Sequence, residues 1–122
     1  MKRLLTLAVA ALALTTAAAS AANPRSAFGI HLYNCHVAQN GNSTDGVWVN
    51  YTNSRAKTAT EVDFAVRYNG LPAVMTDVGS FTQGAQIQHT LHNAMIGAAW
   101  NGEVPQVCRV YRVVWADGSI SK

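Results

Sequence analysis

The sequence predicts an all-β protein, a two-sheet antiparallel sandwich of six or seven short strands with an immunoglobulin-like architecture. Three observations lead to this prediction. Apolar and polar residues alternate with a period of two in several runs, clusters of turn-forming residues separate these runs, and two cysteines lie near opposite ends of the domain. Such alternation is typical of half-buried strands. No run has a convincing amphipathic helical pattern, which favours two packed sheets.

The first 22 residues differ in character from the rest of the chain. A basic start, MKR, is followed by an apolar run that ends at Leu14 and then by a tract of small residues. This is the layout of a secretory signal peptide. We expect cleavage after Ala22, with Ala21 as the alternative, and a single β-sandwich domain over residues 23–122. A retained membrane anchor is the competing interpretation, because the leader is nearly long enough to span a bilayer.

Cleavage would change the charge of the protein. The whole chain has nine basic and six acidic residues and a net charge of +3, but two of the basic residues lie in the leader. The seven that stay leave the domain at +1. The basic character of the chain therefore belongs mostly to the leader, and we expect no nucleic-acid partner.

The centre of the predicted fold is a pair of strands within residues 46–70. In each strand large apolar residues alternate with residues that are mostly polar, and a polar segment, residues 53–58, joins the two strands. One face of the pair carries Val47, Val49, Tyr51, Val62, Phe64, Val66 and Tyr68. Period-two alternation of this length is expected where one face of a sheet is buried.

The other strands follow from the same pattern and from the turns between them. The alternation that starts at Phe28 ends in the segment QNGNSTDG, whose Asn-Gly and Asp-Gly pairs favour a chain reversal. Pro72 stands at the start of a weaker strand, where a missing hydrogen-bond donor does least harm. The segment 92–106 contains Gly and Pro and is irregular. We expect strands at residues 28–37, 47–52, 62–68, 71–78, 85–91, 107–115 and 119–121.

The two cysteines, Cys35 and Cys108, predict a disulfide, because an even pair in an exported protein is usually oxidised. A free reactive thiol is the alternative, although neither cysteine belongs to a CxxC pair. The order Cys35, Trp48, Cys108 also matches the cysteine, tryptophan, cysteine order of immunoglobulin domains. The match is partial, because Gln106 stands where such a domain usually has a tyrosine.

Three segments together resemble a group of small, uncharacterised secreted proteins of Gram-negative bacteria. They are VWVNYTNSRAKTATEVDFAVRYNG, DVGSFTQGAQIQHTL and CRVYRVVWADGS, and they span about residues 47–119. The chain is also loosely similar to FxLYD-type bacterial β-sandwich domains. Because the shared motifs are structural, the resemblance implies a β-sandwich in a secreted or periplasmic protein, and it implies no activity.

Four histidines, His31, His36, His89 and His92, are the candidates for binding copper or zinc. Within each neighbouring pair the separation is odd, so the two side chains are expected on opposite faces of a strand. We therefore interpret them as surface or core histidines and expect no metal site and no cofactor.

A hydrolytic triad could be built from Ser80, His89 and Asp77, since acyl transfer needs a nucleophile, a base and an orienting carboxylate. However, the local sequence DVGSF is not the Gly-x-Ser-x-Gly elbow. Glu61 and Asp63 lie on one strand face, and we interpret them as solvated outward charges. The sequence therefore assigns no catalytic residue.

The residues that could form a binding surface are Trp48, Asn50 and Trp115. If the valines beside Trp48 face the core, Trp48 points outward with Asn50 and can stack on a sugar or anchor a protein partner. If Trp48 instead packs between the sheets, as the cysteine spacing suggests, this surface disappears. We favour a buried Trp48. Trp115 is ambiguous in the same way.

These observations favour an exported, non-enzymatic module with a binding or envelope-structural role. Its expected partner is a protein or glycan in the cell envelope or outside the cell, and after cleavage it would have no membrane span. The alternatives are a small secreted hydrolase and a periplasmic copper- or zinc-binding protein.

Overall fold

The computed structural model describes residues 24–39, 45–68, 70–92 and 104–122. The predicted signal peptide lies outside the described residues, as do the tip of the QNGNSTDG turn and most of the segment predicted to be irregular. Within the described ranges, no helix has the length and apolar character needed to cross a membrane.

Seven antiparallel strands in the described part of the chain form two sheets, as the sequence predicts. One sheet has the order β1-β2-β5 and the other has the order β4-β3-β6-β7. The strands are β1 (Ile30–Gln39), β2 (Asp45–Asn53), β3 (Ala59–Tyr68), β4 (Leu71–Phe81), β5 (Gln86–His92), β6 (Val107–Trp115) and β7 (Ile120–Ser121).

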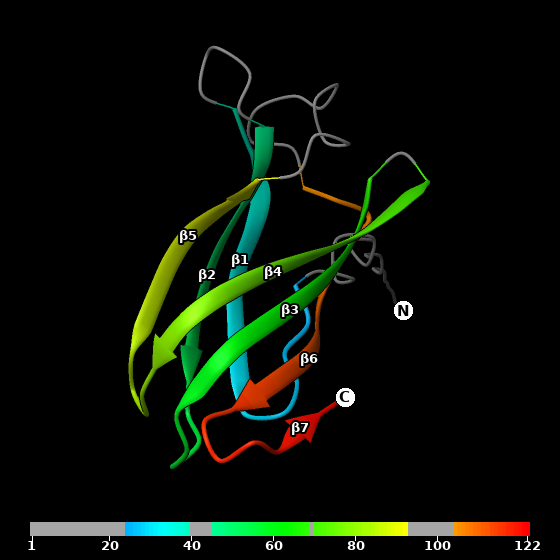
Figure 1. Ribbon diagram of the computed structural model, residues 1–122. Helices are drawn as coiled ribbons and strands as arrows, with labels where there is room; N and C mark the ends of the chain where they lie inside the picture. The colour runs from blue at the N-terminus through cyan, green and yellow to red at the C-terminus, as the bar shows by residue number, and fades with distance from the viewer. Residues whose placement is uncertain (1–23, 40–44, 69, 93–103) are drawn as a thin grey trace, which may run out of the picture.

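The two sheets pack face to face, with the four-stranded sheet in front of the three-stranded sheet in Figure 1. Strand β2 lies between β1 and β5, while β3 lies between β4 and β6. Immunoglobulin domains likewise place the second strand beside the first and the fifth, and the third strand beside the sixth. Here β4 belongs to the four-stranded sheet, where it is the edge strand beside β3. The predicted immunoglobulin-like sandwich is confirmed.

The core lies between the sheets and is built from the alternating residues of the central strands. Val47, Val49 and Tyr51 on β2 are fully buried. They face Val62 and Phe64 of β3, which are also fully buried. The ring of Tyr51 meets the edge of Phe64 with centroids 5.2 Å apart, a favoured geometry for aromatic pairs. The alternation seen in the sequence therefore sets which face of each strand is buried.

A β-bulge interrupts β1 and changes which of its residues face outward. The register shifts between Leu32 and Asn34, so Tyr33 is an extra residue in the strand. Leu32 and Cys35 both face the core, although three positions separate them. A bulge adds one residue to a strand and reverses the alternation beyond it.

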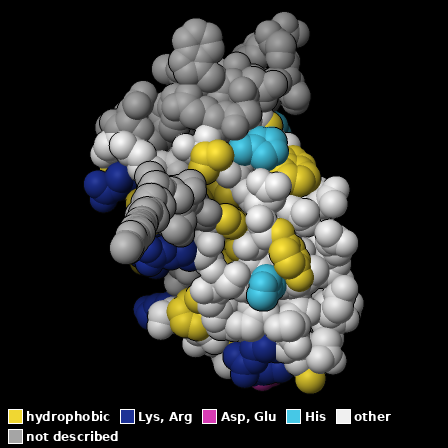
Figure 2. Space-filling view, turned by 180° about the vertical axis from the view of Figure 1, so that it is seen from behind, with side chains coloured by type: hydrophobic (Ala, Val, Ile, Leu, Met, Phe, Trp, Pro, Cys, Tyr) yellow, Lys and Arg dark blue, Asp and Glu magenta, His cyan; other side chains and the backbone are white. Residues whose placement is uncertain are grey.

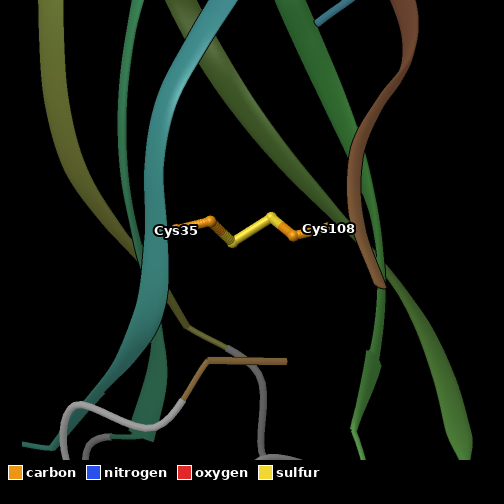
Figure 3. The surroundings of a disulfide bond; sticks show 2 residues. All are labelled: Cys35 and Cys108. Atoms are coloured by element: carbon orange, nitrogen blue, oxygen red, sulfur yellow. A yellow bond between two sulfur atoms is a disulfide. The ribbon is translucent and has the colours of Figure 1, made fainter. Parts of the chain in front are cut away.

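The predicted disulfide joins Cys35 of β1 to Cys108 of β6 across the two sheets (Figure 3). The two Cα atoms lie 6.6 Å apart, within the usual range for a disulfide. In immunoglobulin domains the bond joins the second and sixth strands, and the tryptophan belongs to the third. Here the bond begins on the first strand and Trp48 belongs to the second, so the apparent Cys-Trp-Cys match is not structurally equivalent.

The segment before β1 pairs with the edge of β6. The amide of Arg25 donates to the carbonyl of Cys108, and the amide of Val110 donates to the carbonyl of Arg25, both at 3.0 Å. This parallel bridge places Arg25 beside Arg109. A tight turn through Phe28, whose φ is 58°, then leads into β1.

Candidate functional site

The outer face of the three-stranded sheet carries aromatic and uncharged polar side chains, and we call it the aromatic–amide face. Its residues occupy the strand positions that alternate with the buried valines, and they form cross-strand rows. Trp48 is paired with His36 on one side and with Thr90 on the other. The face consists of His31, Tyr33, Asn34, His36, Ala38, Trp48, Asn50, Thr52, Gln86, Gln88, Thr90 and His92.

Trp48 lies on the central strand of this face and is half-buried. Its indole ring stacks on the imidazole of His36, with centroids 4.9 Å apart and an angle of 27° between the planes. Nδ1 of His36 lies 3.1 Å from the carbonyl oxygen of Val37, which holds the imidazole in place. The stacked pair fixes the direction of the indole ring.

A second aromatic pair lies on the same face. The rings of His31 and Tyr33 have centroids 4.9 Å apart, and Tyr33 is 52 % exposed. The hydroxyl of Tyr33 lies 3.3 Å from that of Thr52 on β2. The ordinary alternation of β1 places Tyr33 on the same side as His31, and the bulge that follows keeps Asn34 on this side as well.

The side-chain amides provide the polar groups of the face. Nε2 of Gln86 donates to Oδ1 of Asn50 at 3.2 Å, across the β2–β5 ladder. Asn34 and Gln88 are the register partners of Asn50 on the two flanking strands. Each carboxamide can both donate and accept hydrogen bonds, so the row offers both donors and acceptors to a ligand.

The aromatic–amide face has no Asp, Glu, Lys or Arg among its described residues. Figure 2 views the molecule from the side of the three-stranded sheet. It shows histidine side chains beside hydrophobic side chains, while Lys and Arg side chains lie toward the edges of the view. Among the described residues of this face, the titratable side chains are those of the histidines and of Tyr33.

The structure corrects two predictions about the tryptophans. Trp48 was expected in the core, but Val47 and Val49 occupy the inward positions and leave Trp48 on the outer face with Asn50. Trp115 is 1 % exposed and does not belong to a binding surface. Its indole nitrogen donates to the hydroxyl of Ser121. The guanidinium carbon of Arg55 lies over the ring, 4.9 Å from its centroid. Of the three predicted surface residues, only Trp48 and Asn50 come together.

The prediction that neighbouring histidines lie on opposite faces is wrong for His31 and His36. The bulge after Leu32 reverses the alternation and places His36 on the same outer face as His31. His92 shares this face, whereas His89 points inward in register with Val49. Within the described part of the chain, no group of three or more His, Cys, Asp or Glu residues could hold a metal ion.

Two members of the hypothetical triad do meet, at the edge of the sandwich. Nδ1 of His89 lies 2.8 Å from Oδ2 of Asp77, and the hydroxyl of Tyr51 donates to the same oxygen at 2.7 Å. Burial and the hydrogen bond to the Asp77 carboxylate raise the pKa of Tyr51 far above its usual range. Ser80 is exposed, and the hydrogen-bond partner of His89 among the described residues is Asp77. Ser80 therefore does not complete the hypothetical triad with His89 and Asp77.

The sequence predicts that Glu61 and Asp63 on β3 are both solvated, but the structure buries Asp63. Asp63 is 3 % exposed, and its Oδ1 is buried without a hydrogen-bond partner among the described residues. Nη1 of Arg112 lies 3.4 Å from Oδ2 of Asp63 and 3.7 Å from Oε2 of Glu61. A hydrogen bond with the Asp63 carboxyl, followed by burial, raises the pKa of Glu61, while Arg112 opposes this shift.

Searches of protein-family models, curated proteins and solved structures found no match to this chain.

The contribution of Tyr33 and His36 to the aromatic–amide face was not predicted from the sequence. One signal for it was present in β1, where the apolar residues Leu32, Cys35 and Val37 are spaced by three and then by two. Such a change of spacing within a strand indicates a bulge, which places the flanking polar residues on one face.

Proposed function

We propose that the protein is an exported, non-enzymatic binding module that holds a neutral glycan on its aromatic–amide face. The observation that carries this proposal is the outward indole of Trp48, fixed by His36 and flanked by a row of side-chain amides. Export is supported by the leader-like start of the chain and by the disulfide, which forms in oxidising compartments.

A sugar ring matches the chemistry of this face. Its C–H groups form an apolar surface that packs on an aromatic ring, while its hydroxyl groups need both donors and acceptors. Trp48 supplies the ring, and Asn50, Gln86 and Gln88 supply the amides. The lack of acidic and basic side chains favours a neutral ligand, because a charged polymer would lose solvation without gaining an ion pair.

The shape of the face favours a chain of sugars. The rows run across three strands, and the two aromatic pairs lie at different positions along β1. An extended glycan could contact the His36–Trp48 pair and the His31–Tyr33 pair with separate sugar units. We therefore expect affinity to rise with glycan length until both pairs are covered.

The proposal is tested by co-sedimentation of the purified protein with insoluble neutral polysaccharides such as cellulose, chitin and β-glucan. We expect at least one of them to retain the protein and Trp48→Ala to weaken retention about tenfold, as for the loss of a stacking aromatic residue at an interface. Tyr111→Ala is the matched control, because Tyr111 is an exposed aromatic residue on the other sheet.

Equal losses in Trp48→Ala and Tyr111→Ala would contradict the proposed site, as would retention by none of the polysaccharides. If a protein from the host envelope binds in a Trp48-dependent manner while glycans do not, the face is a protein interface and the glycan assignment is wrong. Export is checked separately by mass spectrometry of the mature protein, which should begin at Asn23.

A further inference from the structure

The outer face of the four-stranded sheet contains an apolar hollow of about 530 Å³, which we call the β3 groove. It forms because Ala65 is small and stands between Val74 on β4 and Arg109 on β6, its two register partners. The groove is lined by Ala65, Val66, Arg67, Pro72, Ala73, Val74, Val107 and Arg109. Its volume is within the range of about 300–1,000 Å³ that is typical of small-molecule sites.

Two arginines stand at this groove, and no acidic residue lines it. Arg67 is two positions along β3 from Ala65, and Arg109 is directly opposite Ala65 on β6. Neither has a carboxylate within ion-pair distance in the part of the chain that the structure describes. Arg112, on the same strand as Arg109, is instead held by Asp63. Guanidinium groups without a carboxylate partner are suited to binding phosphate or carboxylate groups.

Backbone pairing places another basic side chain at this end of the sheet. The parallel bridge between Arg25 and Arg109 brings a third arginine beside the groove. The acidic residues of β3, Glu61 and Asp63, lie toward the other end of the strand. The charge on the outer face of this sheet therefore changes from acidic at one end to basic at the other. The basic end coincides with the apolar hollow.

The groove suits an acyl chain better than a peptide. Strand β3 is hydrogen-bonded to β4 on one side and to β6 on the other, so the backbone groups beneath the groove are already paired. A peptide lying across them would bury its own amide and carbonyl groups without partners, which is costly. The hydrocarbon tail of an acyl chain has no such groups and can cover Val74 and Pro72, which are exposed.

We propose that the β3 groove binds an anionic amphiphile, with its acyl chain in the hollow over Ala65 and its phosphate headgroup on Arg67 and Arg109. The site lies on the sheet opposite the aromatic–amide face, so it is independent of glycan binding. A protein with both sites would bind a phosphate-bearing lipid on one face and a glycan on the other.

The test is isothermal titration of the purified exported protein with dodecyl phosphate below its critical micelle concentration. Two parallel titrations separate the contributions of the ligand. Inorganic phosphate provides the anion without the chain, and dodecyl maltoside provides the chain without the anion. We expect one dodecyl phosphate per protein, bound at least about tenfold more tightly than either partial ligand, because both groups contribute.

Arg67→Gln and Arg109→Gln should each weaken dodecyl phosphate binding about tenfold, as for the loss of one charge-assisted hydrogen bond. Ala65→Trp should abolish it by filling the hollow. Lys122→Gln removes the same charge at the exposed carboxyl end and should leave binding unchanged. Thermal unfolding of each variant confirms that it is folded.

Equal affinity for dodecyl phosphate and dodecyl maltoside would overturn the headgroup assignment. Equal affinity for inorganic phosphate would show a simple anion site and would also overturn the proposal. A loss of binding in Lys122→Gln as large as in Arg67→Gln would mean that only net charge matters, and the groove would then have no specific role.

Discussion

The carboxylate of Asp77 lies 2.8 Å from Nδ1 of His89 and joins β4 to β5, which are edge strands of different sheets. Tyr51 adds a third strand to this contact by donating its hydroxyl to Asp77. The disulfide joins β1 to β6, so the sheets are tied together at two separate places. An inward charge on an edge strand also discourages pairing with a strand of another molecule.

Tyr51→Phe is expected to destabilise the protein by about 1.5–3 kcal/mol, because it removes a hydrogen bond to a buried charged group. The measurement is the free energy of unfolding in urea. Tyr33→Phe is the control, since the Tyr33 hydroxyl is exposed and its contact with Thr52 is long at 3.3 Å. Similar stabilities for the two variants would show that Asp77 does not depend on Tyr51.

Replacing both Cys35 and Cys108 by alanine is expected to lower the free energy of unfolding by about 4 kcal/mol. The bond closes a loop with a sequence separation of 73, and the chain-entropy model gives this magnitude for such a loop. Urea unfolding measures the change. The native protein should also migrate differently on gels with and without reductant, and two alkylatable thiols in the unreduced exported protein would contradict the disulfide.

Trp48 and Trp115 are expected to differ in how strongly their replacement by alanine destabilises the protein. Trp115→Ala should cost about 3–5 kcal/mol, because it opens a cavity in the core. Trp48→Ala should cost only about 0.5–1.5 kcal/mol, the usual value of an aromatic pair, since Trp48 lies on the outer face. Thermal and urea unfolding compare the two. If Trp48→Ala were as damaging as Trp115→Ala, the outer face would be part of the scaffold rather than a binding surface.

The strands, the disulfide and the two-sheet architecture could be predicted because each depends on local patterns or on the pairing of just two cysteines. Val62, Phe64 and Val66 alternate on β3, and the structure buries all three. The position of Trp48 could have been predicted from the same alternation. The cysteine spacing of immunoglobulin domains predicts a buried Trp48, whereas the period of β2 predicts an outward one, and the structure follows the period.

The candidate sites were harder to predict because they depend on register and on contacts between strands. The shared face of His31 and His36 depends on a single extra residue in β1. The contact between Asp77 and His89 joins different sheets, and the β3 groove requires Ala65 to stand between two particular partners. None of these pairings follows from composition or period, because register fixes which residues are opposite one another.

Glu61 is expected to make the stability of the protein depend on pH. Its pKa in the folded protein is raised, chiefly by the hydrogen bond with Asp63, whereas the unfolded value is about 4.3. Between these two values the folded state holds a proton that the unfolded state has lost. Stability therefore falls as the pH rises through this window and is highest below it. Glu61→Gln cannot ionise, so its stability should exceed that of the wild type increasingly above about pH 4.

The opposite dependence is expected for Asp117 and supplies the control. Hydrogen bonds from Ser119, together with Lys57, lower the pKa of Asp117 below its usual range. Its contribution to stability is present above the unfolded value of about 3.9 and is lost as the pH falls through the lower folded value. Asp117→Asn should therefore be less stable than the wild type at neutral pH. Urea unfolding of the three proteins across this pH range compares the slopes, and parallel curves for the wild type and Glu61→Gln would exclude a shared proton between Glu61 and Asp63.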